Sequence, residues 1–203
     1  MRPSEPTGTT ISLFLDIGQG AGLAGATGVR PFLPPLLAAA LALGDVGLDF
    51  DGTAYSFLET PAFFGVVLGL AVLSMAVERR GAERRGVLEV GLAVVAVCLG
   101  ALLFAGSLAD HGYPGWAGLA SGAACAALGY LAGRSLFDGA RRRLEPAAAK
   151  LLTLYADALA LGLAAVAILV PPLSLLALVA FGVLLVRSRR AQGRKFEGLR
   201  ILR

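Results

Sequence analysis

The sequence predicts an all-α integral membrane protein with about six transmembrane helices. We expect two three-helix halves of inverted topology, with a first helix that is broken or re-entrant. Two observations predict the class: 57% of the 203 residues are hydrophobic and only 16% are charged, and the mean hydropathy is +0.75. A water-soluble domain is nearer half apolar and a quarter charged, so much of this surface must face lipid.

Apolar windows of about 19 residues predict the individual spans. They cover residues 11–43, 60–78, 87–108, 114–138, 152–170 and 172–186. The last two are separated by Pro171-Pro172, because proline cannot continue a regular helix. A tight turn there gives six spans, whereas one long kinked helix would leave five. The expected divisions are a first half at 1–108, a second half at 109–186 and a tail at 187–203.

The charges of the connecting segments predict the orientation. Basic residues gather at 78–85, at 141–150 and in the tail, whereas 44–59 and 109–115 contain no Lys or Arg. By the positive-inside rule, we expect a multi-pass protein of the cytoplasmic membrane with both termini in the cytoplasm. Candidates for binding anionic lipid at the cytoplasmic face are the tail residues Arg187, Arg189, Arg190, Arg194 and Lys195. The alternative is that they only anchor the topology.

The first apolar segment, 11–43, is too long for an ordinary span. As one helix it would measure about 50 Å, against about 30 Å for the hydrocarbon core. A run of glycines followed by Arg30-Pro31 predicts a break. Free amides at Thr27 and Gly28, beside Arg30, would favour an anion or a carboxylate partner. A kinked helix packed through its glycines, with Arg30 in a structural ion pair, is the alternative.

A spacing that recurs along the chain predicts the repeat. Gly25 precedes Arg30 as Gly129 precedes Arg134, and each pair is followed by a span whose beginning carries an acid, Glu59 or Asp157. Because each half would hold three spans, the second half would enter from the opposite side of the membrane.

Ionisable side chains within spans are the candidate functional residues, because each costs on the order of 3 kcal/mol to insert. We expect the pairs Arg30–Glu59 and Arg134–Asp157, which would either hold substrate or merely fasten helices together. The candidate substrate-binding residues are Thr27, Gly28, Arg30, Glu59, Arg134 and Asp157. The candidates for proton or ion coupling are Asp16, Glu59 and Asp157.

The sequence lacks the motifs of enzymes, metal sites and nucleic-acid-binding proteins. The single histidine, His111, lies in a loop, and no metalloprotease or nucleophile-elbow pattern is present, so we expect no enzyme, metal or cofactor. The basic residues lie beside apolar spans without a nucleic-acid-binding motif, so we expect no nucleic-acid partner. Small-xxx-small spacings such as Gly65/Gly69 suit close helix contacts, including those of a homo-oligomer.

Three stretches carry a family resemblance: residues 25–34, the triplet Tyr155-Ala156-Asp157 and residues 196–203. Together they resemble a family of small bacterial membrane proteins catalogued as domain of unknown function 4126. The segment after the second span departs from that family, since it is short and arginine-rich instead of longer, acidic and histidine-containing. The resemblance implies a location in the bacterial inner membrane and implies no activity.

These patterns predict a compact inverted-repeat transporter or permease. Its substrate would be a small anionic solute or a lipid-linked head group, held by broken helices near the middle of the membrane. The alternative is a non-transporting membrane scaffold or assembly partner with a lipid-binding basic tail.

Overall fold

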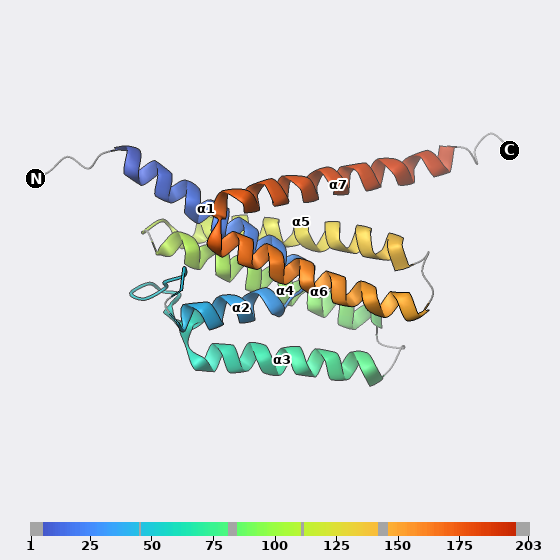
Figure 1. Ribbon diagram of the computed structural model, residues 1–203, viewed down its shortest axis with the longest axis horizontal. Helices are drawn as coiled ribbons and strands as arrows, with labels where there is room; N and C mark the ends of the chain where they lie inside the picture. Colours follow the sequence, from blue (N-terminus) through green and yellow to red (C-terminus); the bar gives the residue numbers. More distant parts are fainter. Residues whose placement is uncertain (1–5, 45, 81–84, 111, 142–145, 198–203) are drawn as a thin grey trace, which may run out of the picture.

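The computed structural model describes residues 6–44, 46–80, 85–110, 112–141 and 146–197. This part of the chain forms seven α-helices and one short 3-10 helix, without a strand (Figure 1). The elements are α1 Pro6–Val29, α2 Leu33–Ala42, η1 Ser56–Glu59, α3 Pro61–Arg80, α4 Arg85–Ala109, α5 Gly115–Arg141, α6 Pro146–Leu169 and α7 Pro171–Glu197. The all-α prediction is confirmed.

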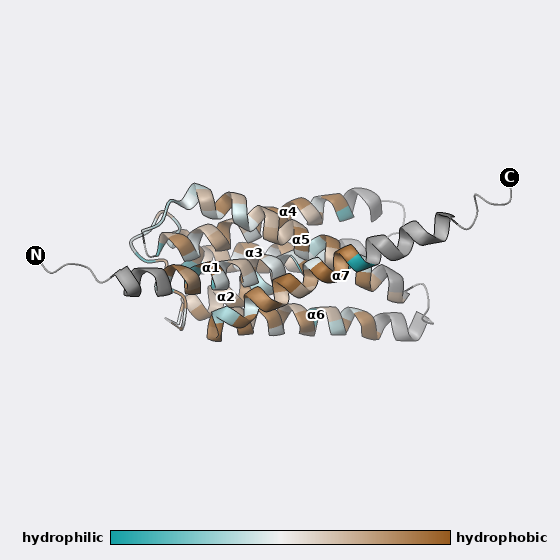
Figure 2. Ribbon diagram, turned by 90° about the horizontal axis from the view of Figure 1, so that it is seen from above, coloured by the Kyte–Doolittle hydropathy of each residue, from teal (hydrophilic) through white to brown (hydrophobic). Residues whose placement is uncertain are grey.

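Three helices of the described chain are long and apolar enough to cross a membrane: Glu89–Ala109, Gly115–Phe137 and Leu151–Leu169. Shorter apolar helices cover Leu33–Ala42, Pro61–Ala76 and Pro171–Arg187. Figure 2 shows hydrophobic residues along the outward sides of the helices, clearly on α6 and α7. An all-helical chain with such an apolar surface fits the predicted membrane class.

The predicted break in the first segment is confirmed at Arg30–Phe32. The amide of Arg30 still donates to the carbonyl of Ala26 at 3.1 Å, but Pro31 has no amide to continue the ladder. The next helix begins at Leu33 and carries Pro34 and Pro35 in its first turn. Proline is tolerated there, because the amides of a first turn have no partner within the helix.

The helix directions do not confirm the predicted repeat (Figure 1). α1 enters the bundle from one end and α2 returns toward that end, so the two form a helical hairpin. α5 starts at the same end as α1 and runs in the same direction. Helices related by inversion would run in opposite directions, so the matched spacings Gly25–Arg30 and Gly129–Arg134 are not the mark of inverted halves.

The predicted placement of both termini in the cytoplasm is not shown by the fold. α1 begins at one end of the bundle and α7 finishes beyond the other end (Figure 1). The fold therefore does not give both termini the common face that six full spans would give. The predicted turn at Pro171 is confirmed, since α6 ends at Leu169, α7 starts at Pro171 and the two helices run in opposite directions.

α1 is the central helix, and glycines bring it close to its neighbours. A Cβ on Gly28 would lie 2.0 Å from the carbonyl oxygen of Ala126 in α5, and one on Gly129 would lie 2.1 Å from the carbonyl oxygen of Gly25. Both distances are far below any real Cβ contact. Glycine is thus required where α1 crosses α5, because only a residue without a side chain lets the two backbones touch.

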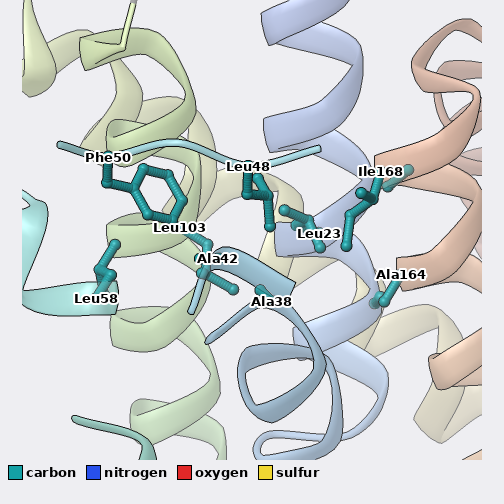
Figure 3. Packing of buried hydrophobic residues seen from close by; sticks show 11 residues of the cluster. Leu23, Ala38, Ala42, Leu48, Phe50, Leu58, Leu103, Ala164 and Ile168 are labelled. Atoms are coloured by element: carbon teal, nitrogen blue, oxygen red, sulfur yellow. The ribbon is translucent and has the colours of Figure 1, made fainter. Parts of the chain in front are cut away.

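Residues 46–60, which we call the plug, fold back into the end of the bundle where α2 finishes. Leu48, Phe50 and Leu58 of the plug are buried. Figure 3 shows them beside Leu23 of α1 and Leu103 of α4, in one cluster. The cluster is completed by Ala26, Ala38, Ala42, Ala164, Ala167 and Ile168. The apolar residues of this otherwise acidic segment therefore form part of the main core.

Candidate functional site

The tip of the hairpin holds an ion pair between Arg30 and Asp157. The guanidinium Nε lies 2.6 Å from Oδ1 of the carboxylate, and the side chains are 24% and 31% exposed. Nη2 of Arg30 also donates a hydrogen bond to the carbonyl of Thr153, at 3.2 Å. One arginine therefore joins the bend after α1 to two successive turns of α6.

The chain bends at Arg30 for a local reason and meets α6 for a tertiary one. Pro31 ends the hydrogen-bond ladder of α1, so Arg30 is the last residue that this helix can hold. α1 itself is fixed on α5 by Gly25 and Gly28. Asp157 lies in the middle of α6, in the candidate span Leu151–Leu169. The pair is therefore built on rigid helices and lies far from the ends of α6.

The predicted pairs are wrong. Arg30 meets Asp157 instead of Glu59, because α2 turns back and carries Glu59 to the end of the bundle. Glu59 accepts a hydrogen bond from the backbone N–H of Phe50 within the plug. Asp157 is held by Arg30, so Arg134 is not its partner.

Arg134 pairs with Glu89 on the surface of the bundle. Its Nη2 lies 3.4 Å from Oε2 of Glu89, and the side chains are 51% and 55% exposed. Its Nη1 donates to the hydroxyl of Tyr130, one turn earlier in α5, at 3.1 Å. This longer and more exposed pair ties α4 to α5 and is separate from the hairpin tip.

The remaining residues predicted to bind substrate or ions do not contact the Arg30–Asp157 pair. Thr27 is fully buried and donates from Oγ1 to the carbonyl of Leu23 in its own helix, at 2.7 Å. Gly28 packs against the backbone of α5. Asp16 is buried in α1, well before the bend. Thr27 and Gly28 are therefore packing residues, and their predicted role in binding substrate is not supported by their positions.

The predicted lipid-binding residues lie at the far end of α7. Arg187 is exposed. The side chains of Arg189, Arg190, Arg194 and Lys195 lie outside the described residues. Their role in binding anionic lipid stays a prediction.

Three carboxylates meet in the plug. Oxygen atoms of Asp49, Asp51 and Glu59 lie within 4.8 Å of one another. Desolvation raises the pKa of Glu59, the negative charges of Asp51 and Asp49 raise it further, and the hydrogen bond from Phe50 opposes both effects. The plug therefore favours the protonated form of Glu59 more than the unfolded chain does.

This raised pKa predicts how the stability depends on pH. Because the folded state binds the proton more tightly, ionisation of Glu59 costs stability as the pH rises from its ordinary pKa through the raised one. We expect Glu59→Gln to match the wild type at acidic pH and to unfold at a higher temperature at neutral pH. Unfolding midpoints in detergent between about pH 4 and about pH 7 measure this. A difference that stays constant with pH would contradict it.

Sequence reasoning missed the carbonyl of Thr153 and the hydroxyl of Ser174. Ser174 is buried and donates to the carbonyl of Gly18 in α1, which fastens α7 to the central helix. A serine in the first turn of an apolar span that begins with two prolines was a usable signal for such a contact. A carbonyl that accepts from a distant arginine has no sequence signal.

In comparisons with known proteins, no family model, curated protein or solved structure matches the chain.

Proposed function

We propose that this chain is a membrane transporter for a small anion or an anionic head group, with Arg30 and Asp157 as its site. The observation that carries the proposal is a partly exposed ion pair at the tip of a re-entrant hairpin, midway along α6. Charge exposed to lipid tails is costly, and irregular backbone at that depth persists only against protein or a wet cavity. The exposed part of the pair would then face water or a ligand.

The proposed orientation follows from the loop charges. α3 to α7 would cross the membrane, and the hairpin of α1 and α2 would enter and leave from the outer face. The basic segments at 78–85 and 141–150 join helices at the end of the bundle where α7 finishes, which would be cytoplasmic. The acidic plug and the start of α1 would lie at the outer face. A bacterial inner membrane would provide this setting.

The geometry of the pair suggests how an anion and a proton would be coupled. Arg30 places Nε against the carboxylate of Asp157 and donates from Nη2 to the carbonyl of Thr153. An incoming anion would bind the guanidinium and displace the carboxylate of Asp157. The displaced carboxylate would then take up a proton, so that each anion moves together with one positive charge. Release on the other side would restore the ion pair.

Proton movement in proteoliposomes tests this proposal. Vesicles loaded with a pH dye are given an inward gradient of chloride, nitrate, phosphate or glutamate, and a fluorescent anionic phospholipid is the second probe. We expect at least one probe to move faster than in empty vesicles. Arg30→Gln and Asp157→Asn should each lower that rate by about tenfold or more, because each leaves a lone charge at the site.

The matched control is Arg134→Gln, which removes an arginine from the exposed pair with Glu89. It should leave the rate near that of the wild type. Equal rates for the wild type, Arg30→Gln and Asp157→Asn would exclude the hairpin tip as the site. No movement of any probe would contradict transport of these anions.

The second candidate is a membrane scaffold. The hydrogen bond from Arg30 to the carbonyl of Thr153 favours a scaffold, because an arginine that only joins two helices gains from a backbone acceptor that does not move. A scaffold would tolerate an exchange of the two charges between Arg30 and Asp157 with little loss of function. A transporter that binds its anion at Arg30 would not.

A further inference from the structure

The plug is held against the end of the bundle by buried apolar side chains and by a hydrogen bond to α1. Phe50 is 1% exposed and fits over Gly106 of α4, where an added Cβ would lie 2.7 Å from the Phe50 ring. Gln19 of α1 donates to the carbonyl of Gly47 at 2.7 Å. Gly47 has φ +70°, a conformation that suits glycine. The plug thus combines buried apolar side chains with a polar contact to the central helix.

Small side chains separate the plug from the ion pair. Ala26 lies one turn before Arg30, and its carbonyl accepts the amide of Arg30. Ala38 of α2 and Ala164 of α6 belong to the same buried cluster as Phe50. All three alanines are 0–1% exposed, so water does not reach them while the plug is seated. With the plug lifted, the seam between α1, α2 and α6 would be bounded by apolar side chains, these three alanines among them.

The ion pair is sealed in one direction and partly open in the other. On the side of the plug it is covered by the buried cluster, yet its side chains retain 24% and 31% exposure. α2 has only 10 residues and returns to the plug, so neither α1 nor α2 occupies the opposite half of the bundle. The hairpin therefore does not cover the pair on the side of the end where α7 finishes.

We propose that the plug is a gate, whose release exposes the seam between α1, α2 and α6 and so opens the second route to Arg30 and Asp157. This inference rests on the proposed transport function. The gate closes when Phe50 and Leu58 of the plug seat over Gly106 of α4. Such a segment opens by local unfolding, because what holds it is mainly the burial of a few side chains.

Thiol labelling under the plug tests the gate. The background carries Cys98→Ala and Cys125→Ala, which remove both native thiols, and Ala38→Cys supplies the reporter. A charged, membrane-impermeant thiol reagent is added to the plug side of sealed vesicles. We expect slow labelling with the native plug and a rate about tenfold higher or more with Phe50→Ala, because loss of a buried phenylalanine weakens the seated state.

Gly106→Ala is the second variant, since its methyl group would push the Phe50 ring aside without removing it. It should also accelerate labelling. The matched control is Gly65→Ala in α3, where an added Cβ meets nothing within 4 Å, and it should label as slowly as the background. Elution as a single species on size exclusion shows that each variant is folded.

Two results would overturn the gate: equal slow labelling in folded Phe50→Ala and Gly106→Ala, or fast labelling with the native plug. If anion flux is intact, either result would refute the gate without contradicting the proposed transport function. Faster labelling in both variants without flux would refute transport and leave a mobile plug.

Discussion

Gly129→Ala should strongly destabilise the protein, although it adds only one methyl group. The new Cβ would lie 2.1 Å from the carbonyl oxygen of Gly25, a backbone atom that cannot rotate away. α1 and α5 would have to separate, although α1 is packed on several other helices. We expect a loss of about 1–3 kcal/mol or more, and an unfolding midpoint lower by about 5 °C or more.

Thermal unfolding in detergent, followed by size exclusion after heating, measures this effect. Gly65→Ala is the control, because it makes the same substitution where no atom lies within 4 Å. In a helix, alanine is intrinsically favoured over glycine by about 1 kcal/mol, so the control should unfold at the same temperature or a higher one. Equal midpoints for Gly129→Ala and Gly65→Ala would show that α1 and α5 are not in backbone contact.

Removing one member of the Arg30–Asp157 pair should cost more stability than removing both. Arg30→Met leaves a lone carboxylate midway along α6, and Asp157→Leu leaves a lone guanidinium. Breaking a fully buried pair costs about 3–5 kcal/mol. Because these side chains are partly exposed, we expect about 1–3 kcal/mol for each single variant.

A double-mutant cycle measures the interaction itself. The double variant should lose less than the sum of the two single variants, with a coupling of about 1 kcal/mol or more. The same cycle on Arg134 and Glu89 is the matched control, where the longer distance and greater exposure predict less than about 1 kcal/mol. Strict additivity at Arg30 and Asp157 would contradict an ion pair between them.

The bends of the chain could be predicted from the sequence, because they depend on local chemistry. Proline lacks an amide donor wherever it stands, so Pro31 and Pro171 marked the helix ends without knowledge of any neighbour. Arg30 and Asp157 were predicted as functional residues because a charged side chain within an apolar span costs free energy to insert. The predicted break and these two residues agree with the structure.

The partners could not be predicted, because they depend on where the chain goes after each bend. A helix that restarts after Pro31 can continue across the bundle or turn back, and Ala38 and Ala42 decide this by packing in the main cluster. The return carries Glu59 away from Arg30 and brings Asp157 into its place. The inverted repeat is not confirmed for the same reason, since spacing along a sequence does not record the direction of a helix.

The plug was predicted only as an acidic loop. Its three charged residues are all acidic, and Leu48, Phe50 and Leu58 stand beside or between them. Apolar residues at intervals in a polar connection are a usable sign that it folds back onto a core. Their destination beside Leu23 and Leu103 needed the tertiary structure.

The short α2 has a consequence for the order of events during synthesis. With 10 residues it measures about 15 Å, half of what a span requires, so the lipid alone does not hold it in place. The partners of α1 in α4, α5, α6 and α7 all leave the ribosome after it. α1 is thus synthesised before these neighbours, and Arg30 must stay near water until Asp157 has emerged.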